Sequence, residues 1–482
     1  MKSASLGFSA NPSNDCFFVS KTIPMPTTMS DQEVRQTICL FLVAWEKQPQ
    51  PLTPSFENFL RLGKKNLNPP QRTMATNLIA GVVRERLRLD HFIARLSRTG
   101  GANQPGMQNL LRLALFELEA QGARPRPSFA IVSEAVNLCK IIAPGREGYV
   151  NAILRNFLRR GSAELLPEDN DLAANLSLHY SLPLWLVEKW QQEFGLKPCR
   201  RLCRQANIFA GTTFRVNQLK ISRAELLDRL VAAGPSGLRR GSCSAGAFST
   251  TQASALIDSP WFKEGFISVQ DEGAQLIGEL VNPKPGETIL DACAAPGGKS
   301  AHLAELSRDQ SHIFAADRDR KRLRLISENN LRLQLSSITP AALDLTQPLP
   351  AAWPQSYDAI LLDTPCSGLG VIRRRADLRW RKSPREIAEL AVIQLQILEN
   401  CSRYLRPGGR LIYATCTVSQ PENQDNLKRF LARNPAFRLQ SRDEIEPAHL
   451  RRLISRQGFL ETSFLDEESM DGFFAARLIR TC

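Results

Sequence analysis

The spacing of hydrophobic residues changes twice along the chain. From about residue 31 to residue 160, apolar residues recur at the three- and four-residue spacing of amphipathic helices. In the stretch 107–120 the apolar face consists of Leu110, Leu111, Ala114, Leu115 and Leu118. Another helix is predicted to begin at Ser133, whose hydroxyl can cap it, and a third covers 148–160. Because no strand-like alternation occurs here, this part of the chain is predicted to be all-α.

The middle of the chain has a mixed pattern. The acidic stretch 161–173 contains a proline, which is typical of a linker. After it, a helical pattern at 183–194 is followed by a strand-like pattern at 212–219. We therefore predict a small α+β module, of the RRM-like kind, over 163–264.

From about residue 265, short apolar strands alternate with helices. Strands are expected at the start of 287–300, where a Gly-rich turn and a helix follow, and at 312–319, 338–344, 357–363 and 408–416. A long helix is expected over 383–405. This alternation predicts an α/β domain over 265–482 with a parallel, Rossmann-like sheet and right-handed crossovers. The stretch 471–479 would add an antiparallel edge strand.

The N-terminal segment 1–30 is rich in Ser, Thr, Asn and Pro and lacks the charged and apolar regions of a secretory signal. It is predicted to be a disordered tail. A translation start at Met25 or Met29, or a weak organelle-type leader, remains open. The chain as a whole is therefore expected to be multidomain, with a tail at 1–30, a helical domain at 31–162, the small module and the α/β domain.

The charge balance adds an expected partner. The chain has 62 Lys and Arg against 48 Asp and Glu, a net charge of +14, which favours nucleic acid. A basic enzyme with a solvated surface is the alternative. No apolar run reaches the roughly 18 residues of a membrane span. The eleven cysteines lack paired spacing, which argues against zinc and against a secreted disulfide scaffold and favours reduced thiols in the cytoplasm.

Notable side chains stand at the ends of the predicted strands. Ligands of open α/β sheets bind at the carboxyl ends of the strands. Those ends carry Asp291, Asp317, Asp344, Asp363 and Cys416. Five such coincidences are a stronger signal than any one motif.

The glycine turn at 297–298 lets a ligand approach the backbone closely. It matches neither the dinucleotide fingerprint nor the phosphate loop. Asp317, about twenty residues further on, suits a ribose diol. A site that suits a nucleoside but lacks a phosphate-binding loop favours S-adenosyl-L-methionine as the ligand. Binding of another nucleotide, or a purely structural role of the turn, remains open.

Three motifs carry a family resemblance. The stretches LDACAAPGGKS (290–300), DTPCSGLGVIRR (363–374) and YATCT (413–417) together resemble the RNA cytosine-5 methyltransferases. The helical stretch 133–160 resembles a NusB-type RNA-binding domain. This arrangement is similar to that of the bacterial RsmB (Sun/Fmu) family, whose members methylate C5 of a cytidine in small-subunit (16S) ribosomal RNA. The resemblance implies a NusB-like helical domain and a methyltransferase domain that uses S-adenosyl-L-methionine. It also implies a ribosomal RNA partner, no metal, no membrane association, and a monomer in the cytoplasm.

The resemblance also implies a cofactor site. The loop that would hold the methionine part consists of Cys293, Ala294, Ala295, Pro296, Gly297, Gly298 and Lys299. Asp317 would bind the ribose hydroxyls, Asp344 would lie near the adenine, and Asp363 would lie between the cofactor and the cytosine.

Four residues are expected to carry the chemistry. A thiolate that adds to C6 of cytosine makes C5 reactive toward a methyl sulfonium. The sequence alone favours Cys366 as the nucleophile, because Asp-x-Pro-Cys also occurs in DNA cytosine-5 methyltransferases, where that cysteine attacks. The family resemblance assigns the attack to Cys416 and product release to Cys366. Asp363 would stabilise N3 of the ring, and Lys299 would help supply a positive field.

The basic stretch 373–385 surrounds Trp380 with cations and predicts RNA binding, with a solvated basic face as the alternative. Its cations are Arg373, Arg374, Arg375, Arg379, Arg381, Lys382 and Arg385, and the helical residues Arg155, Arg159 and Arg160 would extend the surface. Three other functions remain open, namely the same chemistry on tRNA or large-subunit rRNA, a non-catalytic RNA-binding factor, and a DNA cytosine-5 methyltransferase.

Overall fold

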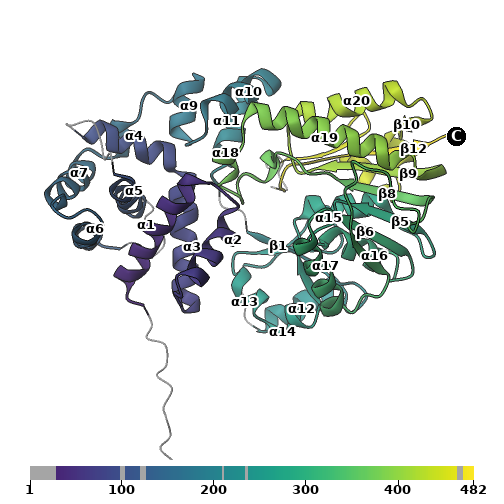
Figure 1. Ribbon diagram of the computed structural model, residues 1–482, viewed down its shortest axis with the longest axis horizontal. Coiled ribbons are helices and arrows are strands. Elements are labelled where there is room, and N and C mark those ends of the chain that lie inside the picture. The colour runs from purple at the N-terminus through teal and green to yellow at the C-terminus, as the bar shows by residue number, and fades with distance from the viewer. Residues whose placement is uncertain (1–28, 98–103, 120–125, 209–210, 234–236, 464–469) are drawn as a thin grey trace, which may run out of the picture.

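The computed structural model describes residues 29–97, 104–119, 126–208, 211–233, 237–463 and 470–482. The predicted tail therefore falls almost wholly outside the described residues. In Figure 1 the N-terminal helices lie on the left and the C-terminal sheet on the right, with the short helix α18 (Leu378–Arg381) between them.

The N-terminal part consists of helices that share one core. They are α1 (Asp31–Lys47), α2 (Leu52–Leu62), α3 (Pro69–Arg84), α4 (Arg86–Leu96), α5 (Pro105–Glu119), α6 (Ser128–Ile142) and α7 (Glu147–Arg160). The buried faces of these helices form a single cluster, which confirms an all-α part for the described residues. Ser133 was wrongly predicted as a cap. α6 begins at Ser128, because Ile131 and Val132 are buried and extend the apolar face upstream.

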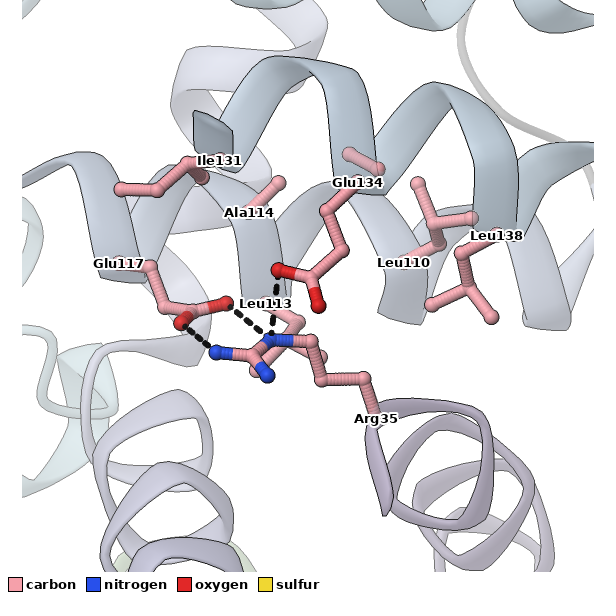
Figure 2. A pocket seen from close by; sticks show the side chains of 9 residues that line it. Arg35, Leu110, Leu113, Ala114, Glu117, Ile131, Glu134 and Leu138 are labelled. Carbon is pink, nitrogen blue, oxygen red and sulfur yellow. Dashed lines mark hydrogen bonds and ion pairs between the residues drawn. The ribbon is translucent and has the colours of Figure 1, made fainter. Parts of the chain in front are cut away.

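A charge cluster joins three of these helices (Figure 2). Arg35 of α1 points between Glu117 of α5 and Glu134 of α6, with Nη2 at 2.6 Å from Glu117 and Nε at 3.3 Å from Glu134. Arg126 pairs with both carboxylates, so that two cations meet two anions. The rest of this small pocket is lined by apolar side chains such as Leu110. The cluster therefore ties the helices together and offers no free group for chemistry.

The middle of the chain contributes to three cores, one of which it forms by itself around Phe214 and Phe248 of its own sheet. Its elements are α8 (Ser162–Leu165), α9 (Ala173–His179), α10 (Leu184–Phe194), α11 (Leu196–Gln205), β1 (Thr212–Val216), α12 (Arg223–Ala233), β2 (Arg239–Arg240), β3 (Ala247–Thr250), α13 (Ala253–Ile257), α14 (Pro260–Lys263) and β4 (Ile267–Val269). The four strands form an antiparallel sheet in the order β2-β3-β1-β4. The predicted linker at 161–173 begins with α8, whose Leu165 is buried in the N-terminal core. Helices α9 to α11 pack instead around Leu369 and Ile372 of the C-terminal part.

The C-terminal part is a mixed sheet with helices on both faces. Its elements are α15 (Glu272–Val281), β5 (Thr288–Ala292), α16 (Gly298–Leu306), β6 (His312–Asp317), α17 (Arg320–Leu333), β7 (Ile338–Ala342), β8 (Tyr357–Asp363), η1 (Leu369–Val371), α18, α19 (Pro384–Ser402), β9 (Leu405–Thr415), η2 (Gln420–Glu422), α20 (Gln424–Arg433), β10 (Phe437–Leu439), η3 (Arg442–Glu444), η4 (Ala448–Leu453), β11 (Phe459–Thr462) and β12 (Phe473–Arg480). Successive residues of β5 alternate between the two faces. Ile289 packs in the cluster under α15 to α17, and Leu290 packs in the cluster under α19 and α20.

The strand order is β10-β12-β9-β8-β5-β6-β7, with β11 also paired to β12. Strands β5 to β9 are parallel, as predicted from the alternation of strands and helices. The prediction of an edge strand at 471–479 was wrong, because β12 pairs with β9 on one side and with β10 and β11 on the other. β10 and β11 are short, and no long apolar run in the sequence predicts them.

Candidate active site

The strand order places the predicted site residues along one edge of the sheet. Cys416 directly follows β9, Asp363 ends β8, Asp291 lies in β5 and Asp317 ends β6, and these four strands are neighbours. Asp344 lies two residues beyond β7, the last strand at that end. All of them therefore meet at the carboxyl edge, where open α/β sheets bind ligands.

The loop from Cys293 to Lys299 connects β5 to α16 and has an unusual backbone. Cys293 has a φ of 62° and Gly297 a φ of 96°, both in the left-handed region. The N–H of Ala294 donates to the carbonyl of Ala316 in the neighbouring strand, which anchors the loop. A Cβ added at Gly298 would meet no atom within 4 Å, so the first turn of α16 is open to a ligand.

Asp317 braces the same loop. Its buried carboxylate accepts hydrogen bonds from the N–H groups of Ala295, at 3.1 Å, and Asp319, at 2.9 Å. Its Oδ2 also lies 3.5 Å from Nη1 of Arg322, while its Oδ1 keeps an acceptor position for a further donor such as a ribose hydroxyl. Asp344 is exposed, and hydrogen bonds from the side chain and backbone of Thr346 lower its pKa.

Asp291 is a buried carboxylate that the protein satisfies only in part. Its Oδ2 accepts from the Ser300 hydroxyl, while its Oδ1 has no partner among the described residues. Burial raises its pKa to about 7. An orphaned acceptor beside an open glycine loop fits a ligand that brings hydrogen-bond donors, such as the amino group of an amino acid.

Lys299 and Asp363 form an ion pair across the loop and the end of β8. Lys299 Nζ lies 2.7 Å from Asp363 Oδ2, and both side chains are largely shielded from solvent. Burial alone would lower the pKa of Lys299, but the charge and hydrogen bond of Asp363 outweigh it and raise that pKa. Lys299 is therefore a fixed positive charge at this edge of the sheet.

The two cysteines face each other at the ends of adjacent strands. The Sγ atoms of Cys366 and Cys416 are 2.9 Å apart, and the N–H of Cys416 donates to Cys366 Sγ at 3.3 Å. The hydrogen bond to Cys416 and burial raise the pKa of Cys366 well above its usual value. The same hydrogen bond lowers the pKa of Cys416, and the charges of Lys299 and Arg375 lower it further. These effects favour Cys416 over Cys366 as the thiolate, while burial and the charge of Asp363 raise the pKa of Cys416 and act in the opposite direction.

The segment after Cys366 is locked against β9 and the start of β12. The N–H of Gly370 donates to the carbonyl of Cys416 at 3.1 Å, and the N–H of Gly472 donates to the carbonyl of Gly370 at 2.8 Å. A Cβ on Gly370 would lie 1.9 Å from the carbonyl oxygen of Gly472. Only glycine allows this approach, so the contact fixes the loop that carries Cys366.

Glu422 of η2 was not predicted as a site residue from the sequence. Its side chain is fully buried and accepts hydrogen bonds from the N–H and hydroxyl of Ser367, the residue after Cys366. The only signal is an acid six residues after Cys416, in a Pro-containing turn. That signal does not separate a buried acid from a solvated one.

The RNA-binding prediction for the stretch 373–385 was wrong for most of its residues. Arg373 is buried against Asp471, and Arg374 pairs with Asp471 and Asp271. Fully buried Arg379 donates to the backbone carbonyls of Arg84, Ser181 and Ala206 and to the Asn207 side chain. Because a guanidinium has five donors, it can satisfy several carbonyls where separate cores meet.

The remaining members of the stretch divide in the same way. Trp380 packs against the N-terminal core and donates its Nε1–H to the carbonyl of Val83 at 2.6 Å. Arg381 pairs with Asp377 within α18. Arg375 is exposed beside the thiols and stays available to a polyanion. Arg385 is exposed and pairs with Glu389 of its own helix. The buried members of the stretch therefore join the helical part to the catalytic loop, and Arg375 and Arg385 are its exposed cations.

The described residues hold no group of three or more His, Cys, Asp or Glu side chains placed to bind a metal ion. Nor do they include a helix with the length and apolarity to cross a membrane.

Comparisons with known proteins agree with this arrangement. A model of the NusB family matches residues 32–159, a model of the ferredoxin-like domain of RsmF/B-like methyltransferases matches 182–246, and the model of the 16S rRNA methyltransferases RsmB/F matches 279–479. This order confirms the predicted fold class of a NusB-like domain, a small α+β module and an α/β methyltransferase domain.

Whole-chain relatives extend the match. The chain is 36% identical over 432 residues to a probable ribosomal RNA small subunit methyltransferase B of Synechocystis, covering 86% of this chain and 93% of that protein. It is 34% identical over 372 residues to a probable enzyme of the same name from Bacillus subtilis, covering 77% of this chain and 82% of that protein. The crystal structure of PH0851 has the same fold, with a TM-score of 0.75 over 94% of this chain and 100% of that chain at 24% identity.

Proposed function

This chain belongs to the RsmB/F family of 16S rRNA methyltransferases, and we propose that it methylates C5 of a specific cytidine in small-subunit ribosomal RNA through a covalent adduct between Cys416 and C6. S-adenosyl-L-methionine is the methyl donor of this family. A cytoplasmic location accords with an rRNA substrate. The observation that carries the proposal is the pair of thiols at adjacent strand ends beside a charged lysine.

The residues at the strand ends fit the methyl donor. The open turn at Gly298 and the orphaned oxygen of Asp291 would receive its methionine part, and Asp317 would accept from its ribose hydroxyls. Asp344, at the next strand end, is assigned to the adenine side. When bound, S-adenosyl-L-methionine supplies an electrophilic methyl group on a sulfonium.

Attack begins at Cys416. Its thiolate donates an electron pair to C6 of the cytosine, the S–C6 bond forms, and the C5–C6 double bond opens into an enamine that is nucleophilic at C5. Negative charge accumulates at N3, where Lys299, held in place by Asp363, would donate a hydrogen bond. The positive charges near Cys416 lower the cost of forming the thiolate.

Release is assigned to Cys366. Once C5 carries the new methyl group, its proton must leave before the product can separate. A base takes that proton, the electron pair of the C5–H bond restores the C5–C6 double bond, and the S–C6 bond breaks. Cys366, within hydrogen-bonding distance of Cys416, would assist by donating its S–H to the departing Cys416 thiolate.

The experiment that tests this division uses three cysteine variants and the rRNA substrate with S-adenosyl-L-methionine. Cys416→Ala should abolish methylation and any covalent protein–RNA band on a denaturing gel. Cys366→Ala should accumulate that band, because attack proceeds and release fails. Exposed Cys482→Ala, which removes a thiol far along the chain, should behave as the wild type. A covalent band from Cys416→Ala would show that the assignment is wrong.

A further inference from the structure

Glu422 is a buried carboxylate held by the segment that carries Cys366. Its side chain is 0% exposed. Its Oε1 accepts from the N–H of Ser367 at 2.8 Å and from Nε2 of Gln394 at 3.0 Å, and its Oε2 accepts from the Ser367 hydroxyl at 2.6 Å. Within the described residues these bonds come from neutral groups, and no Lys, Arg or His pairs with the carboxylate.

The carboxylate also orders the residues that follow both cysteines. Ser367 follows Cys366, and Thr417 follows Cys416; their hydroxyl oxygens are 2.8 Å apart. Because the Ser367 hydroxyl gives its single hydrogen to Glu422, the Thr417 hydroxyl must donate to Ser367. A chain of two directed hydrogen bonds thus links the strand end of Cys416 to the loop of Cys366, and Glu422 sets its direction.

The charges around the two thiols differ. The negative charge of Glu422 adds to the effect of the neighbouring Cys416 and of burial in raising the pKa of Cys366. On the other side, the hydrogen bond to Cys366 and the charges of Lys299 and Arg375 lower the pKa of Cys416, against burial and the charge of Asp363. Glu422 and the two cations therefore favour the same arrangement, a neutral Cys366 beside a Cys416 thiolate.

We propose that Glu422 is a positioning residue that makes the two cysteines inequivalent, holding Cys366 as the neutral thiol whose S–H donates to the Cys416 thiolate. This inference rests on the proposed function, in which Cys416 attacks. Glu422 touches neither substrate nor cofactor in this role. It acts through Ser367 and through its buried charge.

The test compares Glu422→Gln with the matched control Gln394→Met. The first variant removes the charge and keeps the shape. The second keeps the charge but removes the hydrogen bonds that Gln394 makes to the same carboxylate and to the carbonyl of Pro365, as well as those it accepts from Tyr413 and Asn426. Limited alkylation with iodoacetamide at neutral pH, followed by peptide mass spectrometry, gives the ratio of modification at Cys416 to that at Cys366. In E422Q this ratio should fall about tenfold, the effect of one pKa unit, while Q394M keeps the wild-type ratio.

Steady-state kinetics give a second readout. E422Q should lower kcat about tenfold and leave the KM values for RNA and S-adenosyl-L-methionine unchanged, because it alters the thiol pair and not the binding loops. If E422Q keeps the wild-type ratio, or if E422Q and Q394M lower kcat equally, Glu422 only supports the fold and the proposal is overturned.

Two further measurements separate the role of Glu422 from the proposed attack by Cys416 and from a folding defect. If the wild-type protein is alkylated first at Cys366, the proposed attack by Cys416 fails, independently of Glu422. If E422Q does not fold, Ser367→Ala replaces it. That variant keeps the buried charge, so it should lower kcat and retain the preference for Cys416, and preferential alkylation at Cys366 would refute the role of Glu422.

Discussion

Replacing Asp471 by Asn should loosen the segment that carries Cys366. Asp471 immediately precedes the Gly472 contact, and its Oδ1 lies 2.6 Å from Nε of Arg373, three residues after Gly370. Both side chains are 1% exposed. The second oxygen of Asp471 accepts from Arg374, so one carboxylate joins two arginines of the catalytic segment to the start of β12.

The size of the effect follows from burial. Neutralising one member of a buried ion pair leaves the other charge without compensation and costs about 3–5 kcal/mol. The pair of Arg229 and Glu225 in α12 has the same separation, 2.6 Å, but its side chains are 57% and 50% exposed. An exposed pair of this kind contributes about 0.3–0.5 kcal/mol. Asp471→Asn and Glu225→Gln therefore compare a buried carboxylate that pairs with two arginines and an exposed one that pairs with a single arginine at the same separation.

The assay is urea unfolding at pH 7, followed by the fluorescence change of the C-terminal transition and by kcat of the folded variants. Asp471→Asn should lower the free energy of unfolding by about 3 kcal/mol or more and reduce kcat, whereas Glu225→Gln should change the free energy by less than about 0.5 kcal/mol. A loss below about 1 kcal/mol for Asp471→Asn, or equal losses for the two variants, would refute the claim that this buried pair holds the catalytic segment.

Three other predictions concern the same edge of the sheet. Lys299→Met removes a charge that lowers the pKa of Cys416, so the acidic limb of the single-turnover pH–rate profile should move to higher pH; an unmoved limb would contradict the role of Lys299. The pKa of Asp291 is raised to about 7 in the folded protein, so the native state binds the extra proton and wild-type stability should decline as pH rises from about 4 to about 7; in Asp291→Asn, denaturant unfolding across that range should lack this part of the decline. Gly370→Ala should lower both the melting temperature and kcat, because its Cβ would meet the Gly472 carbonyl at 1.9 Å, whereas Gly298→Ala should melt like the wild type and bind S-adenosyl-L-methionine more weakly in calorimetry.

The positions of the strand-end residues could be predicted because they depend on local pattern. A buried parallel strand is a short apolar run, and the polar residue that ends it must lie at the carboxyl edge, as Asp317 and Asp363 do. The contact between the two thiols could not be derived in this way. It depends on β8 and β9 being neighbours in the sheet, and long-range packing sets that order. From the sequence, only the family resemblance predicted that the two cysteines act together.

The basic stretch after the catalytic loop shows the opposite case. The number of charges at 373–385 gives no information on their burial. Inside the protein, the guanidinium group of Arg373 donates to a carboxylate and that of Arg379 donates to backbone carbonyls. The role of Glu422 could not be predicted from the sequence for the same reason. A buried charge is recognised by its partners, and these come from distant parts of the chain, such as Ser367 and Gln394.

The most direct test of the central claim is bisulfite sequencing of ribosomal RNA from cells that lack this gene, complemented with either the wild-type chain or Cys416→Ala. The account predicts that one 5-methylcytidine disappears from small-subunit rRNA, returns with the wild-type chain and does not return with Cys416→Ala. Restoration of that methyl group by Cys416→Ala, or a lost methyl group in tRNA or large-subunit rRNA instead, would contradict it.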